Sequence, residues 1–269
     1  MKTTRKALAV FLAVILVCYC CPVYATIADT PITNATASKA TVSKVVHYSD
    51  MSYAAKVYLT DFDIPINDSS EFMLLTTAGR NKAAYDTASI QVVTKNGDQT
   101  TVSTLYSFTT SDKDTKPDAK LADLFDQPKN RNGTSYSYIN SSKGFKVVGT
   151  VVYSSYPQGG YTYLNLSGAY FTYYDQGGTA PSQIRHVSAC TGHLYTKSGT
   201  SMTQTQEFYR HAIDYTRYSP ISNTVYSSTN AMGSNQYILP VAALGGLTMG
   251  FFVTISGKVY SEENSISYY

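Results

Sequence analysis

Short runs of β-branched and aromatic residues, separated by clusters of Gly, Pro, Ser and Thr, dominate the chain from residue 41 onward. Runs of this composition and length predict strands. Asn96-Gly97 lies between two such runs and predicts a hairpin, because both residues tolerate a positive φ. The predicted strands are 42–48, 53–62, 72–77, 90–94, 100–108, 145–153, 161–174, 184–196, 202–218 and 221–227.

Two polar segments interrupt this pattern. Residues 26–40 are small and polar without an apolar period, which predicts a flexible lead-in. Residues 109–142 are rich in Asp, Lys, Asn and Ser, and only 117–125 is amphipathic enough to predict a short helix. A connection of this length is either a functional loop or a boundary. We therefore expect a β-rich domain over 41–269, either undivided or split in two at 109–142.

Close spacing of strands and near-absence of helix define the expected fold class. We predict an all-β, antiparallel protein, either sandwich-like or a partly open barrel, with at most one short helix after residue 25.

The stretch 238–256 carries no charge and is long enough to cross a bilayer as a helix. Its second half, however, alternates apolar residues with Thr, Gly, Ser and Lys, and only Phe252 breaks the alternation. A period of two places one apolar face on a core, so we predict a strand, with Gly245-Gly246 as a turn before it. A membrane-inserting hairpin over 238–259 is the alternative.

The first 25 residues have the three-part order of a secretory signal peptide. Lys2, Arg5 and Lys6 precede an apolar run, and small residues end at Ala25, where we expect cleavage. The sequence therefore predicts an exported protein, secreted or held at the outer cell surface.

Removing residues 1–25 changes the charge and the cysteine content. Three of the 21 basic residues leave with this segment, so that 18 basic residues balance 18 acidic ones. A neutral chain has no long-range field for phosphates, so we expect no nucleic-acid partner. Cys190 is the only cysteine that remains of four, and one thiol forms no internal disulfide.

A group of His, Cys and acidic residues is the only one with metal-ligand chemistry. A thiolate and imidazoles suit zinc or copper. On a regular strand, however, His186 and Cys190 share a face while His193 points to the other. We favour isolated side chains and assign no metal and no cofactor. The group consists of His186, Cys190, His193, Glu207, His211 and Asp214.

Signatures of catalysis are missing from the sequence. There is no Gly-x-Ser-x-Gly elbow, no His-Glu-x-x-His pair and no phosphate-binding glycine loop. Acid pairs such as Asp61 with Asp63, or Glu207 with Asp214, keep a carboxylate hydrolase as an alternative. Cys190 with a histidine is a second alternative without a local signature. We predict no enzymatic activity and assign no catalytic residue.

Tyrosine is the most abundant aromatic residue: the chain has 25 Tyr, 10 Phe and no Trp. A tyrosine face could bind a glycan, a protein or a second copy, although the lack of Trp removes a strong sugar-stacking residue. Cross-strand packing is the simpler interpretation. We expect a non-enzymatic protein that acts outside the cell by binding or self-association. The densest run contains Tyr161, Tyr163, Tyr170, Phe171, Tyr173 and Tyr174.

Overall fold

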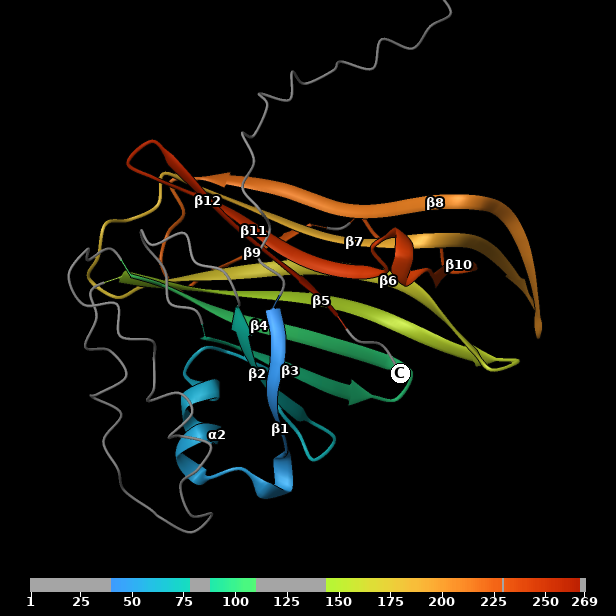
Figure 1. The fold of residues 1–269 in the computed structure, drawn as a ribbon, viewed down its shortest axis with the longest axis horizontal. Helices are drawn as coiled ribbons and strands as arrows, with labels where there is room; N and C mark the ends of the chain where they lie inside the picture. Colours follow the sequence, from blue (N-terminus) through green and yellow to red (C-terminus); the bar gives the residue numbers. More distant parts are fainter. Residues whose placement is uncertain (1–39, 78–87, 110–143, 229, 267–269) are drawn as a thin grey trace, which may run out of the picture. The chain divides into compact units, whose positions relative to one another are not determined.

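The computed structural model describes residues 40–77, 88–109, 144–228 and 230–266, and most of them lie in strands (Figure 1). The strands are β1 (Ala40–His47), β2 (Glu71–Thr77), β3 (Ala88–Asn96), β4 (Gln99–Thr109), β5 (Gly144–Gln158), β6 (Tyr161–Asp175), β7 (Gln183–Ser198), β8 (Ser201–Tyr218), β9 (Thr224–Ser228), β10 (Gln236–Pro240), β11 (Leu247–Ile255) and β12 (Lys258–Ser265). The α-helix is α2 (Tyr53–Thr60), and the 3-10 turns are η1 (Tyr48–Asp50) and η3 (Ala242–Leu244).

All pairings between the described strands are antiparallel. The strand order is β1-β2-β3-β4-β5-β6-β10-β7-β11-β12, with β8 paired to β7 and β9 paired to β6. The sheet does not close into a barrel. The predicted all-β, antiparallel class is therefore confirmed.

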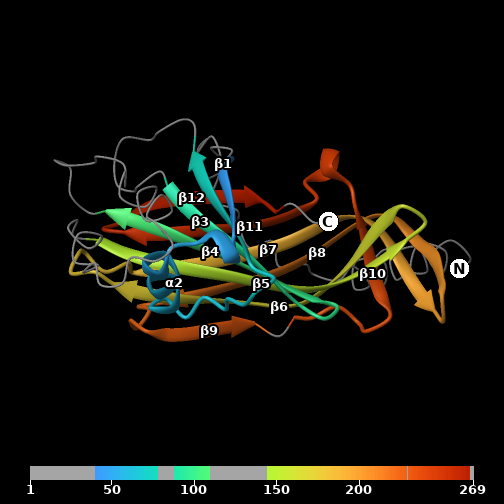
Figure 2. The ribbon, with the colours of Figure 1, turned by 90° about the horizontal axis from the view of Figure 1, so that it is seen from below.

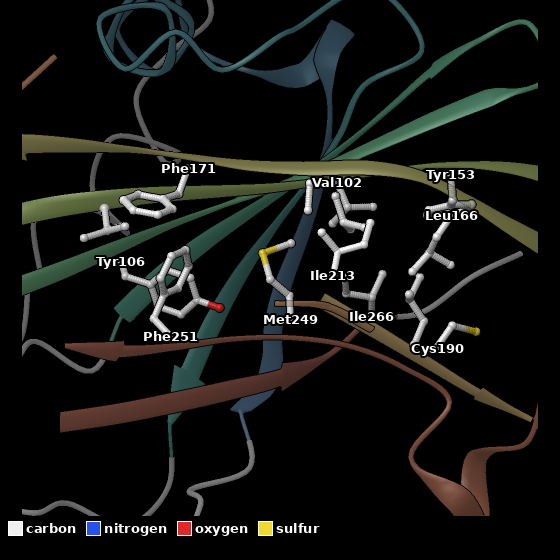
Figure 3. Close-up of a cluster of buried hydrophobic side chains, with 14 of the residues drawn as sticks. Val102, Tyr106, Tyr153, Leu166, Phe171, Cys190, Ile213, Met249, Phe251 and Ile266 are labelled. Atoms are coloured by element: carbon white, nitrogen blue, oxygen red, sulfur yellow. The ribbon is translucent and has the colours of Figure 1, made fainter. Parts of the chain in front are cut away.

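Two halves of this sheet face each other across one buried cluster, which we call the inner core. It combines side chains from β4, β5 and β6 with side chains from β7, β8 and β11. Tyr106 and Phe251 meet there with ring centroids 5.1 Å apart, and Figure 3 shows Met249 beside them. Gly149 makes room for this contact, because a Cβ at that position would lie 2.3 Å from the Phe251 ring. Packing of this kind makes the architecture sandwich-like.

A second cluster covers the opposite face of β2, β3 and β4, and we call it the helix-side core. Residues of α2 pack there against Phe72, Ile90 and Leu105, all at most 1% exposed. Figures 1 and 2 show α2 lying over this part of the sheet. β4 and β5 therefore contribute buried side chains to both cores.

The prediction of a strand at 53–62 is wrong, since Tyr53–Thr60 is the helix α2. Ser52 caps the helix by accepting a hydrogen bond from the backbone N–H of Ala55 at 3.1 Å. The buried positions 54, 55, 58 and 59 have helical spacing, which the β-branched and aromatic composition concealed.

The prediction of a hairpin between β3 and β4 is confirmed, with a turn at Gly97-Asp98, one residue later than Asn96-Gly97. Gly97 has a φ of 60°, which a residue without a Cβ adopts without strain. The other predicted strands are present, although the last one begins at Thr224 instead of residue 221. The segments 1–25 and 26–39, and nearly all of 109–142, lie outside the described residues, and the interpretations given to them stay predictions.

The stretch 238–256 forms strands, as predicted, but not the hairpin considered over 238–259. β10 and β11 do not pair with each other; they lie end to end along β7, opposite residues 192–196 and 183–190. The residues between them form η3, and Gly245 follows it with a φ of 109°. The hairpin partner of β11 is β12. No helix within the described ranges combines the length and apolar character needed to span a membrane.

Candidate functional site

The outer ends of the β5–β6 and β7–β8 hairpins lie at the same end of the sheet, with β10 between them (Figure 1). The Gln158 side chain donates a hydrogen bond of 2.7 Å to the Thr200 carbonyl and thereby links the two turns. β10 pairs with β7 over five residues and with β6 at Leu164. Five strand segments are thus held together in this region.

The register of these strands places four tyrosines on one face. Tyr156 lies opposite Tyr163 in the β5–β6 ladder, and Tyr195 lies opposite Tyr237 in the β7–β10 ladder. Residues directly opposite in an antiparallel pair project to the same side. Lys197 projects to this side as well, because it lies two residues beyond Tyr195 on β7. We call these five residues the tyrosine cluster.

Contacts between the side chains join the two tyrosine pairs. The rings of Tyr163 and Tyr195 are 4.9 Å apart at 75°, and those of Tyr156 and Tyr237 are 6.0 Å apart at 51°. The Lys197 Nζ lies 3.8 Å from the ring centroid of Tyr156 and 5.8 Å from that of Tyr237. Angles of this size between rings give an uneven aromatic surface and exclude a flat stacking platform.

The polar atoms of the tyrosine cluster retain unused hydrogen-bonding capacity. The hydroxyl of Tyr195 donates to Gln204, whereas those of Tyr156, Tyr163 and Tyr237 have no partner among the described residues. Lys197 forms no ion pair with any described carboxylate. Tyr163 is 7% exposed, while the other members are half-buried. Desolvation, followed by the neighbouring hydroxyls, raises the pKa of Tyr163. A cation and several phenol groups are therefore presented together.

The dense tyrosine run of β6 does not form one surface. Phe171 and Tyr173 belong to the inner core, and Tyr174 belongs to the helix-side core. Tyr163 lies in the tyrosine cluster, and its neighbour Tyr161 is 58% exposed. Alternation along the strand separates these side chains, together with a register shift in the β5–β6 ladder.

Cys190 and His211 lie directly opposite each other in the β7–β8 ladder. Cys190 is buried, and desolvation raises the pKa of its thiol to about 12. The His211 Nε2 donates to the backbone carbonyl of Asn230 at 2.8 Å. A buried, protonated thiol is a weak nucleophile.

The two other histidines on β7 occupy different environments. His186 is 0% exposed and stacks on Phe251 with ring centroids 4.6 Å apart. His193 lies at a register shift in the β7–β8 ladder, between Gly192 and Leu194, and its Nδ1 contacts the carbonyl of Glu207. Within the part of the chain that the structure describes, no three His, Cys, Asp or Glu side chains are placed to hold a metal ion.

The acidic pair on β8 is separated by seven residues, which corresponds to about 23 Å along a strand. Asp214 forms a two-point ion pair with Arg185, with an Oδ1–Nε distance of 2.9 Å. Glu207 is exposed. The structure therefore does not bring these two carboxylates together.

The acidic pair after α2 belongs to contacts that hold the helix on the sheet. Asp61 is exposed at the end of the helix, whereas Asp63 accepts a hydrogen bond of 3.1 Å from the Tyr174 hydroxyl. Nearby, Lys146 is 4% exposed and donates to the Tyr58 hydroxyl at 2.8 Å. The first hydrogen bond joins the end of α2 to β6, and the second joins α2 to β5. Both contacts therefore indicate a structural role for Asp63 and Lys146.

Sequence reasoning missed most of the tyrosine cluster. Tyr156, Tyr195, Tyr237 and Lys197 lie outside the dense run and come from three different strands. Tyr156 precedes a Gln-Gly-Gly turn, which marks a hairpin end, but no local signal shows that β10 inserts beside β7. Their proximity depends on that insertion.

Comparisons with protein-family models, with curated proteins and with solved structures find no match for this chain.

Proposed function

We propose that this protein is exported through residues 1–25 and acts outside the cell as a non-enzymatic binding protein, with the tyrosine cluster as its binding surface. The observation that carries the proposal is a cluster of four tyrosines, two of which flank Lys197, with three phenol groups and an ammonium group that have no hydrogen-bond partner among the described residues. Tyrosine gives a rigid apolar ring and a polar tip, which suits it to interfaces.

The placement of the candidate catalytic groups supports binding over hydrolysis. Hydrolysis by two acids requires carboxylates within about 10 Å of each other, facing one substrate. Glu207 and Asp214 are far apart along β8, and Asp214 is paired with Arg185. The Cys190 thiol is buried, and its raised pKa keeps it protonated.

The packing of β11 supports binding over membrane insertion. Met249, Phe251 and Val253 are 0% exposed in the inner core, and β11 is paired on both edges. Burying a side chain of this size contributes about 1.5–3 kcal/mol to the stability of the fold. Inserting β11 into a membrane would remove several such contributions at once. Apolar residues used in this way stabilise the fold.

The test compares the exported wild-type protein with two variants, Tyr237→Ala and Tyr218→Ala. Tyr218 is 68% exposed and lies outside the tyrosine cluster, which makes it a matched control. Each protein is applied to an array of acidic and neutral oligosaccharides and purified extracellular proteins, and its oligomeric state is measured by light scattering.

We expect Tyr237→Ala to lose at least about ten-fold in affinity, since a buried interface tyrosine contributes more than about 1 kcal/mol. Tyr218→Ala should bind like the wild type, and both variants should unfold at nearly the wild-type temperature. Equal binding by Tyr237→Ala and the wild type would disprove a role for the tyrosine cluster. The mass of the exported product shows in addition whether cleavage follows Ala25.

A further inference from the structure

We infer that the tyrosine cluster binds a saccharide that carries a carboxylate, and that Lys197 is the residue that contacts this carboxylate. The inference rests on the proposed function and specifies its ligand class. The only ionic group of the cluster is the Lys197 ammonium, and no described carboxylate pairs with it.

The position of the ammonium group leaves part of it open to a ligand. Nζ lies 3.8 Å from the Tyr156 ring centroid, a cation–π contact that uses one side of the group. An ammonium has three N–H donors, and none of them has an acceptor among the described residues. A carboxylate could accept from Nζ, which would form a charge-assisted hydrogen bond.

The tyrosines supply the contacts that a sugar ring requires. Tyr156 and Tyr237 flank Lys197, and their hydroxyls have no partner among the described residues. A pyranose ring has C–H groups that pack on an aromatic ring and hydroxyls that bond to phenols. Charge attraction also compensates for the missing tryptophan, because stacking is then not the only source of affinity.

An acidic peptide fits this surface less well than a saccharide. Extended peptides bind mainly by adding a strand to a free sheet edge or by filling apolar pockets. At Tyr195, β7 is paired on both edges, with β8 and with β10. β6 is likewise paired on both edges at Leu164, beside Tyr163. Little backbone is therefore open to a peptide at the centre of the cluster.

The experiment measures dissociation constants by calorimetry for three acidic probes: trigalacturonate, a glucuronate-containing tetrasaccharide and sialyllactose. The methyl ester of each probe has the same rings without the charge. Pentaglutamate tests an acidic peptide. The exported wild-type protein is compared with Lys197→Met, which keeps most of the apolar stem, and with Lys197→Arg, which keeps the charge.

We expect at least one acidic probe to bind the wild type at least about ten-fold more tightly than its ester, in line with a charged hydrogen bond. Lys197→Met should lose that difference and Lys197→Arg should keep most of it. The inference is overturned if no acidic probe binds, if ester and acid bind equally, if Lys197→Met retains the preference, or if pentaglutamate binds more tightly. If Tyr237→Ala loses array binding while Lys197→Met keeps it, the proposed function stands without this ligand class.

Discussion

His186 should make this protein sensitive to moderate acidity. The imidazole is 0% exposed, stacks on Phe251, and its Nδ1 has no hydrogen-bond partner among the described residues. Desolvation lowers the pKa of His186 from 6.5 to about 3. The negative charge of Asp214 raises the same pKa, but by less. Asp214 is itself paired with the neighbouring Arg185, which weakens its effect on the imidazole.

The sign of the effect follows from where the proton binds. Between pH 6.5 and about 3, the unfolded chain protonates His186 and the folded chain does not. This contribution to stability is therefore complete above pH 6.5 and is lost as the pH falls toward 3. At about 1.4 kcal/mol for each pKa unit, the total is about 5 kcal/mol, of which about 2 kcal/mol is lost by about pH 5.

Urea unfolding at pH 7.5 and at pH 5.0 would measure this loss, in the wild type and in His186→Phe. Phenylalanine keeps a ring on Phe251 and cannot bind a proton. Between pH 7.5 and pH 5.0, the free energy of unfolding of His186→Phe should therefore decrease by about 2 kcal/mol less than that of the wild type. His47→Gln is the matched control, because the His47 side chain is 64% exposed. Should Phe fit poorly, His186→Gln gives the same comparison. An unchanged pH dependence in both His186 variants would refute the reasoning.

Two further predictions concern β7. Gly192→Ala should destabilise the protein by about 1–3 kcal/mol or more, because the new Cβ would lie 1.9 Å from the Leu239 carbonyl oxygen of β10. Thermal unfolding measures this against Gly168→Ala, whose Cβ would meet nothing closer than 3.9 Å; equal effects would contradict the close approach. Cys190 should react with a thiol reagent at least about a thousand-fold more slowly in the native protein than in urea, since burial raises its pKa from 9.0 to about 12. A native rate close to the unfolded rate would show that the thiol is accessible.

The local sequence pattern predicts a strand correctly where one face of that strand is buried. The alternation in β11 predicted a strand with its apolar residues on a core, and Met249 and Phe251 occupy that core. The local pattern gave a wrong prediction at Tyr53–Thr60, because Val57, Tyr58 and Leu59 have the composition of a strand. Only the Ser52 cap and the buried spacing distinguish that helix.

The candidate site was much less predictable than the fold. A dense tyrosine run on β6 was visible in the sequence, but its members lie in two cores and on the surface. Pairing of β10 with β7 brings Tyr237 beside Tyr195, although 42 positions separate them along the chain. Register between distant strands depends on the whole sheet, so a local pattern contains little information about it.

By itself, the sequence determined the all-β class, most strand positions, the lack of an internal disulfide after residue 25 and the neutrality of that part. These properties depend on composition and on neighbours along the chain. Only the tertiary structure decided that α2 covers one face of the sheet, that β10 and β11 continue each other along β7, and that four tyrosines and Lys197 meet in one cluster. The physical reason is that side chains distant in sequence meet only when strand order and register are fixed, and burial of the two cores fixes both.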